Sequence, residues 1–439
     1  MDRLEINNSA VTVPASQMVN GERQRKVSNP AGEATKADIN SSMPPSKFDV
    51  GWRRVVRNFS PSWFSVTMGT GIVATLLITI PFKADWLYYL SIVFFVLNVI
   101  LFSLALAISI FRYSVYPEIW GVMIADPNNS LFLGTIPMGF ATIVEMWIFV
   151  CVPAWGAPWV TTFAWVLWMI DSIVAAAITT GLPFFIMSTN NYTHTLDRIT
   201  AAQLLPIAAT IVAAGTGSEI AEVLPNPNHA FGTLITSYIM WGMATPLAMI
   251  VIAMYFQRLA LHKLPAREVI VSCFLPLGPC GFGSYTIFHL GKVSREVFPQ
   301  TDIFRDTTTA GTVAGEIAYV FGFLVALILW GFGLVWLTFA LASIYKSRPF
   351  PFSMGWWGFT FPLGVFSVST LEFGIAIPSM FFKVLGTIFS TCVIILWIVV
   401  ALGTIKGAVS GELFYAPCLA NLKRQQREAE AEEDAEKAS

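Results

Sequence analysis

The sequence is a succession of long apolar segments separated by short polar connections. A run of about 20 apolar residues is long enough to cross the hydrocarbon core of a bilayer as a helix. The apolar residues form continuous runs rather than the alternation that marks a half-buried strand. The pattern predicts an all-α polytopic membrane protein with ten transmembrane helices, at roughly 59–80, 86–111, 133–153, 158–183, 199–218, 231–256, 267–290, 312–344, 356–378 and 381–405.

Several connections between successive segments are very short. Residues 153–158, for example, read PAWGAP, which forces the two flanking helices to run antiparallel and side by side. We therefore expect the ten segments to pair into five helical hairpins. The apolar run 312–344 is too long for a helix perpendicular to the membrane, so it must tilt or protrude.

A proline motif repeats in the odd-numbered segments. The motifs are IPMG with Pro137, LPIA with Pro206, LPLG with Pro276 and FPLG with Pro362. Successive prolines are 69, 70 and 86 residues apart, about one hairpin each, and the even-numbered segments have no matching motif. The first segment is looser, with Pro61 at its start and VTMGTG (66–71) in place of the motif. Such an internal repeat predicts an architecture built from repeated units.

The repeated prolines suggest how the helices are arranged. A proline inside a helix removes one backbone hydrogen bond and kinks the chain. At membrane depth, carbonyls freed by a kink are tolerated where they line a cavity or are buried in protein. We therefore expect the five motif-bearing helices to form a kinked inner ring around a central pore. The five unkinked helices would shield that ring from lipid.

Basic residues near the segment ends predict the orientation, because Lys and Arg concentrate on the cytoplasmic side of a membrane. If both termini are cytoplasmic, eleven basic residues fall on the inner side and five on the outer side. The inner set is Arg53, Arg54, Arg57, Arg112, Arg198, Arg258, Lys263, Arg267, Lys346, Arg348 and Lys406, and the outer set is Lys83, Lys292, Arg295, Arg305 and Lys383. This distribution predicts cytoplasmic termini.

Polar segments flank the apolar region on both sides. Residues 1–50 are rich in Ser, Asn, Pro and charge, which predicts a disordered cytoplasmic N-terminal tail. Residues 411–439 contain the run KRQQREAEAEEDAEK, which predicts a charged cytoplasmic C-terminal tail. Between them we expect a ten-helix transporter domain at 51–410.

Composition narrows the classes of function. Only 12% of the residues are charged, against about 25% in soluble domains. The 26 basic residues balance 27 acidic ones, so no nucleic-acid-binding surface is indicated. The five Cys and four His show no metal-ligand spacing, and the sequence has neither a Walker loop nor a GxSxG motif. We expect a protein that is not an enzyme and that uses no cofactor, metal or ATP.

Two stretches carry a family resemblance. NFSPSWFSVTMGTGIVATLL (58–77) and WWGFTFPLGVFSVSTLEF (356–373) resemble the tellurite-resistance/dicarboxylate transporter family, which includes slow anion channels of plant guard cells and fungal malate permeases. The first stretch is most similar to the fungal sulfite efflux pumps of that family. The resemblance implies a quasi-five-fold arrangement of hairpins around a pore in each protomer, and three protomers in a homo-oligomer. It also implies a plasma-membrane anion transporter that exports sulfite.

The residue before each motif proline is a candidate for an apolar constriction. If these residues lie at one level, they form a ring of Ile136, Leu205, Leu275 and Phe361, with Val66 the best match in the first segment. Hydrophobic constrictions can gate a pore by excluding water. Phe361 is the only aromatic member, and it matches the phenylalanine on the ninth helix that plugs the pore of the resembling channels. Phe361 is therefore the predicted gate.

A helix returns to the same face after 3–4, 7, 11 and 14 residues, which assigns further residues to the pore. The predicted pore-lining residues are Thr67, Gly69, Gly139, Thr142, Gly278, Thr286, Gly364, Val365 and Val368. Threonine hydroxyls would offer an anion weak contacts that let it leave again. The face also includes Phe282 and Glu219.

Two ionisable residues on this face, Glu372 and His289, are candidates for a proton-linked step. A carboxylate in an anion pore repels the substrate unless it is neutralised or paired. A structural hydrogen bond, or an ion pair with Lys292 or Lys383, explains Glu372 equally well.

The identity of the anion, sulfite or bisulfite, rests on the resemblance alone. A malate-type dicarboxylate permease would need a basic residue to hold a carboxylate, and no Lys or Arg interrupts the centre of an inner segment. An intramembrane enzyme would use Glu145, Glu372 and His289 as acid–base groups, although no nucleophile or metal-ligand set accompanies them. Helical periodicity places Glu145 half a turn off the pore face.

Overall fold

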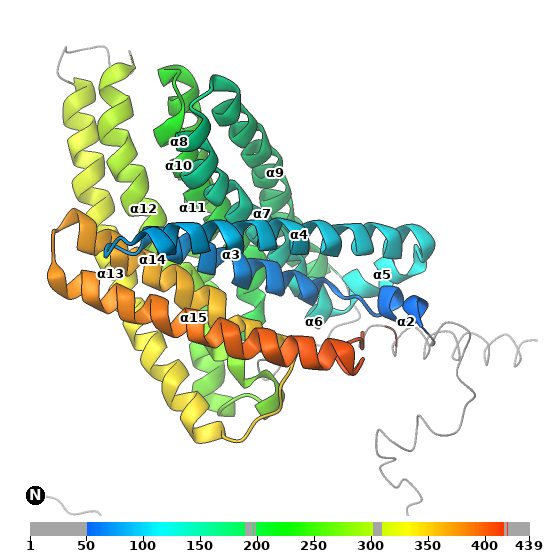
Figure 1. Ribbon diagram of the computed structural model, residues 1–439. Coiled ribbons are helices and arrows are strands. Elements are labelled where there is room, and N and C mark those ends of the chain that lie inside the picture. The colour runs from blue at the N-terminus through cyan, green and yellow to red at the C-terminus, as the bar shows by residue number, and fades with distance from the viewer. Residues whose placement is uncertain (1–50, 189–195, 197–198, 302–309, 417–418, 420–439) are drawn as a thin grey trace, which may run out of the picture. The chain divides into compact units, whose positions relative to one another are not determined.

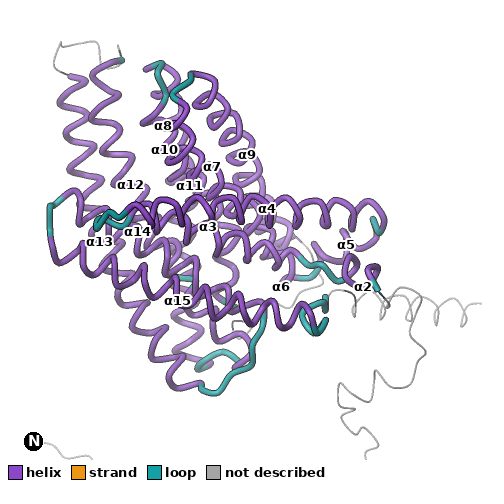
Figure 2. Tube along the Cα trace, viewed as in Figure 1, coloured by secondary structure: helices purple, strands orange, loops and turns teal. Residues whose placement is uncertain are grey.

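The computed structural model describes residues 51–188, 196, 199–301, 310–416 and 419. Within these ranges the regular structure is helical and contains no strand (Figure 2). Ten helices are long and apolar enough to cross a membrane: Pro61–Thr79, Asp85–Val115, Leu131–Trp155, Pro158–Ser188, Ala201–Val223, Pro227–His262, Arg267–Gln300, Gly311–Ser347, Met354–Ala376 and Met380–Val409. They confirm the all-helical polytopic fold predicted from the sequence.

The odd-numbered spans each begin with a short 3₁₀ segment and continue as an α-helix. These pairs are η1 (Pro61–Trp63) with α3 (Phe64–Thr79), η2 (Leu131–Gly134) with α7 (Thr135–Met146), η5 (Ala201–Gln203) with α10 (Leu204–Val223), η6 (Arg267–Phe274) with α12 (Leu277–Val297), and η8 (Met354–Phe359) with α14 (Thr360–Ala376). The even-numbered spans are the α-helices α4 (Asp85–Val115), α9 (Pro158–Ser188), α11 (Pro227–His262), α13 (Ala310–Ser347) and α15 (Met380–Val409). Shorter elements are α2 (Trp52–Arg57), α5 (Glu118–Ala125), α6 (Pro127–Ser130), the π-helical turn η3 (Trp147–Cys151), α8 (Val152–Trp155) and η7 (Phe298–Gln300).

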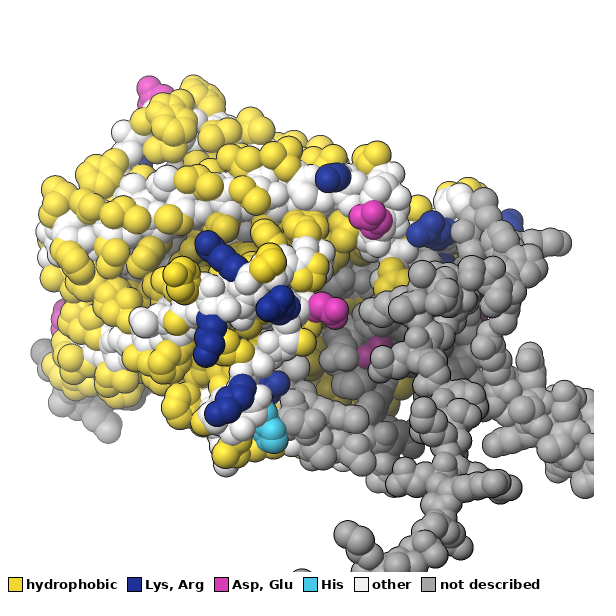
Figure 3. All heavy atoms as spheres, turned by 90° about the horizontal axis from the view of Figure 1, so that it is seen from below, with side chains coloured by type: hydrophobic (Ala, Val, Ile, Leu, Met, Phe, Trp, Pro, Cys, Tyr) yellow, Lys and Arg dark blue, Asp and Glu magenta, His cyan; other side chains and the backbone are white. Residues whose placement is uncertain are grey.

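The odd-numbered spans are buried and the even-numbered spans are exposed. Between 72% and 100% of the most apolar stretch of each odd-numbered span is buried, against 22% to 33% in the even-numbered spans. The exposed sides of the even-numbered spans carry Ile, Val, Leu and Phe. In Figure 3, which views the molecule from below, hydrophobic side chains cover much of the described surface, and Lys and Arg lie singly or in small groups among them. An apolar exterior of this kind suits a helix that faces lipid.

The two ends of the helical region meet. The helices α14 and α15 lie beside α3, although they come from opposite ends of the region (Figure 1). Just beyond α15, the ring of Phe414 stacks on Trp63 with 5.0 Å between ring centroids. The backbone N–H of Ala416 donates to the side-chain oxygen of Asn58. Residues 1–50, predicted as a tail, and most of the C-terminal tail lie outside the described residues.

Contrary to the prediction, the motif prolines do not interrupt helix interiors. Pro137, Pro206 and Pro362 are the third residues of α7, α10 and α14, and Pro276 directly precedes α12. The first N–H groups of an α-helix have no partner within the helix, so a proline there removes no intrahelical hydrogen bond. These prolines therefore mark the change from 3₁₀ to α geometry.

Interior prolines occur instead in two even-numbered spans, which were expected to be unkinked: Pro183 lies inside α9 and Pro246 inside α11. A further proline, Pro153, follows the π-helical turn η3 in the third span. Proline has no N–H to donate to the carbonyl four residues earlier, and its ring displaces that carbonyl. The backbone accordingly widens into a π-turn before Pro153, directly after the end of α7.

Candidate functional site

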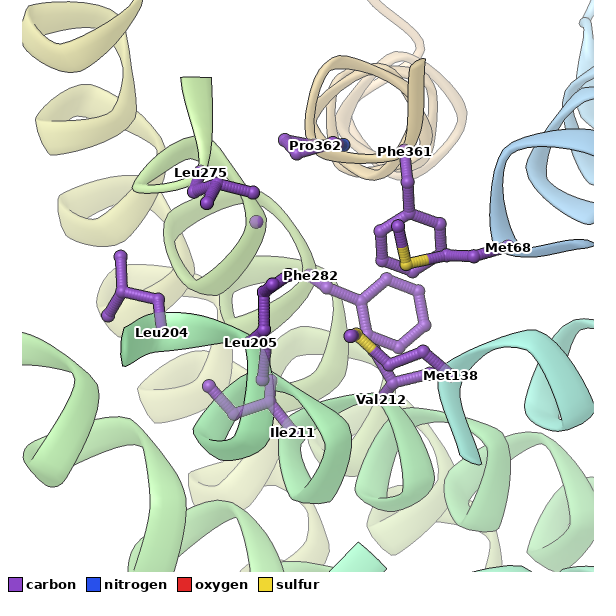
Figure 4. Close-up of a pocket in the computed structure, with 12 residues that line it drawn as sticks. Met68, Met138, Leu204, Leu205, Ile211, Val212, Leu275, Phe282, Phe361 and Pro362 are labelled. Atoms are coloured by element: carbon purple, nitrogen blue, oxygen red, sulfur yellow. The ribbon is translucent and has the colours of Figure 1, made fainter. Parts of the chain in front are cut away.

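Two cavities lie among the odd-numbered spans, one apolar and one polar. The apolar cavity has a volume of about 20 Å³, roughly the space that one water molecule needs. It is lined by Met68, Met138, Leu204, Leu205, Ala208, Ile211, Val212, Leu275, Gly278, Phe282, Phe361 and Pro362 (Figure 4). Because these side chains are all apolar, they offer neither water nor an anion a hydrogen-bond partner.

Two aromatic rings meet at the apolar cavity. Phe361 projects into it from the first turn of α14, beside Met68 of α3 (Figure 4). Phe282 of α12 reaches the same place, and the side chains of Phe361 and Phe282 are only 4% and 3% exposed. Phe282 also lines the polar cavity, so its ring lies between the two.

Gly215 on α10 makes room for the second ring. A Cβ atom at this position would lie 2.3 Å from the ring of Phe282 and 2.8 Å from the hydroxyl of Thr286. Any larger residue would push the ring away from α10. The position of Phe282 is therefore set by close packing between α10 and α12.

Three members of the predicted constriction ring, Leu205, Leu275 and Phe361, line the apolar cavity. Ile136 does not, because it lines a separate outer groove between α4 and α9. Val66 is half-buried and lines neither cavity. Met68 and Met138, two residues further along α3 and α7, line the apolar cavity instead. Two residues rotate a helix by about 200°, so this difference in register moves the side chains to the opposite face.

The polar cavity has a volume of about 310 Å³ and adjoins Phe282. Its walls come mainly from the C-terminal halves of the odd-numbered spans, whereas the apolar cavity is built from their first turns. The ionisable residues that line the polar cavity are Lys83, Glu145, Glu219, Glu222, Tyr285, His289, Lys292 and Glu372.

Two of these carboxyl groups are buried and bonded to hydroxyl groups. Glu145 is 1% exposed, and the hydroxyls of Thr216 and Thr75 lie 3.1 and 3.4 Å from its two oxygens. Glu219 is 3% exposed and accepts a hydrogen bond of 2.7 Å from Tyr285. Hydroxyl groups rather than cations thus contact both carboxyl groups, while Oε2 of Glu219 has no hydrogen-bond partner among the described residues. Glu145, predicted to lie off the pore face, lines the polar cavity. Counted from Met138 it lies seven residues on, which is the same face of the helix.

A third carboxylate, Glu222, holds two basic residues of α12. Its Oε2 lies 3.1 Å from Nε2 of His289, and its Oε1 lies 3.0 Å from Nζ of Lys292. The sequence suggested Lys292 as an ion-pair partner of Glu372. Glu222 pairs with Lys292 instead, because α10 continues to Val223 and α12 to Val297, beyond the predicted ends at 218 and 290.

The remaining charged residues at the polar cavity are less tightly held. Glu372 is half-buried and forms no ion pair within the described part of the chain. Lys83, in the connection between α3 and α4, donates to the carbonyl of Ile78. Partial burial lowers the pKa of Lys83. Among the described residues, no three His, Cys, Asp or Glu side chains are placed to hold a metal ion.

Of the predicted pore-lining residues, Gly278 lines the apolar cavity and Val368 the polar one. The others line neither cavity: Thr67, Gly69, Gly139, Thr142, Thr286, Gly364 and Val365. Thr67 and Thr142 donate their hydroxyl protons to backbone carbonyls of their own helices. A Cβ atom at Gly364 would lie 2.5 Å from Ile72. The close approach at Gly364 packs α14 against α3.

Comparison with known proteins bears on what such a site does. Residues 58–405 match the voltage-dependent anion channel family, SLAC1. A sulfite efflux pump, SSU1, of Arthroderma otae is 49% identical over 359 residues, which cover 82% of this chain and 93% of the relative. A sulfite efflux pump of Candida albicans is 30% identical over 80% of this chain and 74% of the relative. A malic acid transport protein of Schizosaccharomyces pombe is 23% identical over 82% of this chain and 81% of the relative.

The family match includes both stretches on which the resemblance rested, 58–77 and 356–373, and the residues that line both cavities. It therefore confirms the resemblance. The chain is a multi-pass membrane protein with ten apolar helices, and it belongs to the SLAC1 family of voltage-dependent anion channels.

Proposed function

We propose that this chain is a plasma-membrane transporter that exports sulfite. The observation that supports sulfite as the substrate is the 49% identity to a sulfite efflux pump over 93% of that protein's length. Membership of an anion channel family supports an anion as the transported species. By the same resemblance, we propose that the protomers assemble as trimers with one pathway in each.

The two cavities support a route for the anion. In our proposal the five hairpins surround a quasi-five-fold axis, and the anion passes from the apolar constriction into the polar cavity. The volume of about 20 Å³ at the constriction has room for about one water molecule, so the described conformation is closed to an oxyanion. Opening requires the rings of Phe361 and Phe282 to turn aside. With both termini cytoplasmic, the polar cavity faces outward.

Flux measurements in liposomes test this proposal. Purified protein would be reconstituted, and the uptake of sulfite, sulfate, nitrate and malate compared with and without a pH gradient. We expect sulfite uptake to exceed that of the other three anions. Malate uptake without sulfite uptake would contradict sulfite as the substrate. Flux of none of the four would contradict transport and favour an enzyme that uses Glu145, Glu372 and His289.

One observation favours the dicarboxylate permease as a second candidate. The sequence argument against it was the lack of a basic residue in the inner segments. The structure brings Lys292 and His289 of α12 to the polar cavity, where both contact a carboxylate. These two residues suit the carboxylate of malate as well as an inorganic oxyanion. The malate arm of the flux experiment separates the two candidates.

We expect Glu372→Gln to raise sulfite flux at neutral pH by about two- to fivefold, and to flatten the dependence of flux on pH. An ionised Glu372 repels the anion, whereas glutamine mimics the protonated carboxyl group. The charged groups across the cavity are Glu145 on the third span, Glu219 and Glu222 on α10, His289 and Lys292 on α12, and Lys83. Flux measured from pH 5 to 8 checks the prediction. An unchanged rate and pH profile would remove Glu372 from any proton-linked step.

A further inference from the structure

Two basic residues of α12 converge on one spot in the polar cavity. His289 and Lys292 are three residues apart, so their side chains lie on the same face of the helix. Both contact Glu222, and each takes a different oxygen of its carboxylate, at 3.1 and 3.0 Å. The two donors therefore bind two oxygens that share one central atom.

Both ring nitrogens of His289 have hydrogen-bond partners. Ser218 has one hydroxyl proton and donates it to the carbonyl of Gly215 at 2.6 Å. Its oxygen also lies 2.9 Å from Nδ1 of His289 and holds the ring in place. Nε2 faces a carboxylate, which accepts hydrogen bonds, so Nε2 donates to Glu222 beside the ammonium of Lys292. His289 and Lys292 thus each present one donor to the same carboxylate.

The position of Glu222 allows its carboxylate to move away from His289 and Lys292. Glu222 is the next-to-last residue of α10, and the last turn of a helix is its least constrained part. The side chains of Glu222 and Lys292 are 34% and 36% exposed, whereas His289 is only 5% exposed and is fixed by Ser218. His289 thus belongs to the wall of the cavity, whereas Glu222, partly exposed at a helix end, is the anion that can exchange.

We propose that His289 and Lys292 form an oxyanion-binding site and that Glu222 is its built-in competitor. A transported anion replaces the carboxylate, oxygen for oxygen, and the carboxylate returns when the anion leaves. The ligand class is a small anion with at least two oxygens on one central atom, such as sulfite. Chloride, a single atom, cannot supply two oxygens. Competition from Glu222 keeps binding weak, which favours release. The inference rests on the proposed export of sulfite only for the statement that the ligand is also the substrate.

Binding measured without transport tests this site. The full-length purified protein would be titrated with sodium sulfite and, separately, with sodium chloride at constant ionic strength, and its melting temperature recorded, because a ligand of the folded state raises it. The variants are Glu222→Gln and Lys292→Gln. Glu268→Gln serves as a matched control, because Glu268 is an exposed acid of η6 in the same span that does not line the polar cavity.

We expect Glu222→Gln to lower the apparent Kd for sulfite about tenfold, since one charge-assisted hydrogen bond corresponds to about that factor. Lys292→Gln should raise the Kd about tenfold, and Glu268→Gln should leave it unchanged. Chloride should stabilise all four proteins equally and weakly. The KM for sulfite flux should follow the same order as the Kd.

A Glu222→Gln variant that binds sulfite no more tightly than the wild type would overturn the competitor role. In that case Glu222 is a structural partner of His289 and Lys292. If the wild type transports sulfite while none of the variants changes the Kd, the proposed binding site is contradicted and the proposed function is supported. If the wild type binds sulfite and the variants change the Kd as expected, but no sulfite is transported, the proposed function is contradicted and the binding site is supported.

Discussion

Phe361→Ala is expected to raise sulfite flux by at least about tenfold, which corresponds to lowering the barrier by about 1.4 kcal/mol. The ring of Phe361 is 4% exposed and faces a cavity of only about 20 Å³. Removing it opens the narrowest part of the proposed pathway and lets water enter a site that is otherwise too small and too apolar. Flux per reconstituted protein, measured in liposomes, checks the result.

Phe359→Ala is the matched control for this variant. Phe359 is 6% exposed, lies two residues before Phe361, and packs on the ring of Phe274 at 5.0 Å between centroids. It lines neither cavity. Both variants lose a buried ring, which costs about 3–5 kcal/mol of stability in a core, so the amount of folded protein must be compared. Equal flux in Phe361→Ala and Phe359→Ala would contradict the role of Phe361 as the gate.

The second aromatic ring adds a further measurement to this result. Phe282 lines the apolar cavity opposite Phe361 and separates it from the polar cavity. Because the two rings occupy the same narrow space, Phe282→Ala should also raise flux, and the double variant should exceed either single variant. A double variant no faster than Phe361→Ala would show that Phe282 contributes no barrier of its own.

Gly281→Ala is expected to lower the melting temperature by several degrees, because overpacking a tight contact costs about 1–3 kcal/mol. A Cβ atom at Gly281 would lie 2.6 Å from Cα and 2.7 Å from the backbone N of Phe366. These are backbone atoms of α14, so relief requires α12 and α14 to separate. Small residues let membrane helices approach this closely, and the packing that results stabilises them. Thermal unfolding of the purified protein in detergent measures the effect.

Gly278→Ala is the control on the same helix, one turn earlier. No atom lies within 4 Å of a Cβ built at Gly278, so the melting temperature should not change. Gly278 does line the apolar cavity, and a methyl group there narrows the constriction. We therefore expect Gly278→Ala to lower flux while Gly281→Ala lowers stability. The same loss of stability in both variants would contradict the contact between α12 and α14.

The sequence predicted much of the fold. Long apolar runs predict membrane-spanning helices, and the ten predicted segments correspond to the ten apolar helices of the described residues. The ends were less certain, since a helix can continue past the apolar region when its polar residues face a cavity. Glu222 and Lys292 lie beyond the predicted ends for that reason. The pairing of Glu222 with Lys292 at the polar cavity was therefore missed.

The prediction of the site was also inaccurate in the alignment of the first and third spans. Aligning the segments on their prolines selected Val66 and Ile136. The structure selects Met68 and Met138. From those two residues, a step of seven leads to Thr75 and Glu145, which both line the polar cavity. A proline motif marks the height along a helix, but it does not define the face that the helix turns inward.

The sequence by itself determined the ten spans and the family, because apolar length and motif identity are properties of each segment alone. The tertiary structure alone decided which residues face the cavities. The rotation of a helix about its own axis is set by its neighbours, as where Gly281 of α12 meets the backbone of Phe366 or Gly215 receives the ring of Phe282. Such contacts join positions far apart in the chain, and no local pattern of hydrophobic residues records them.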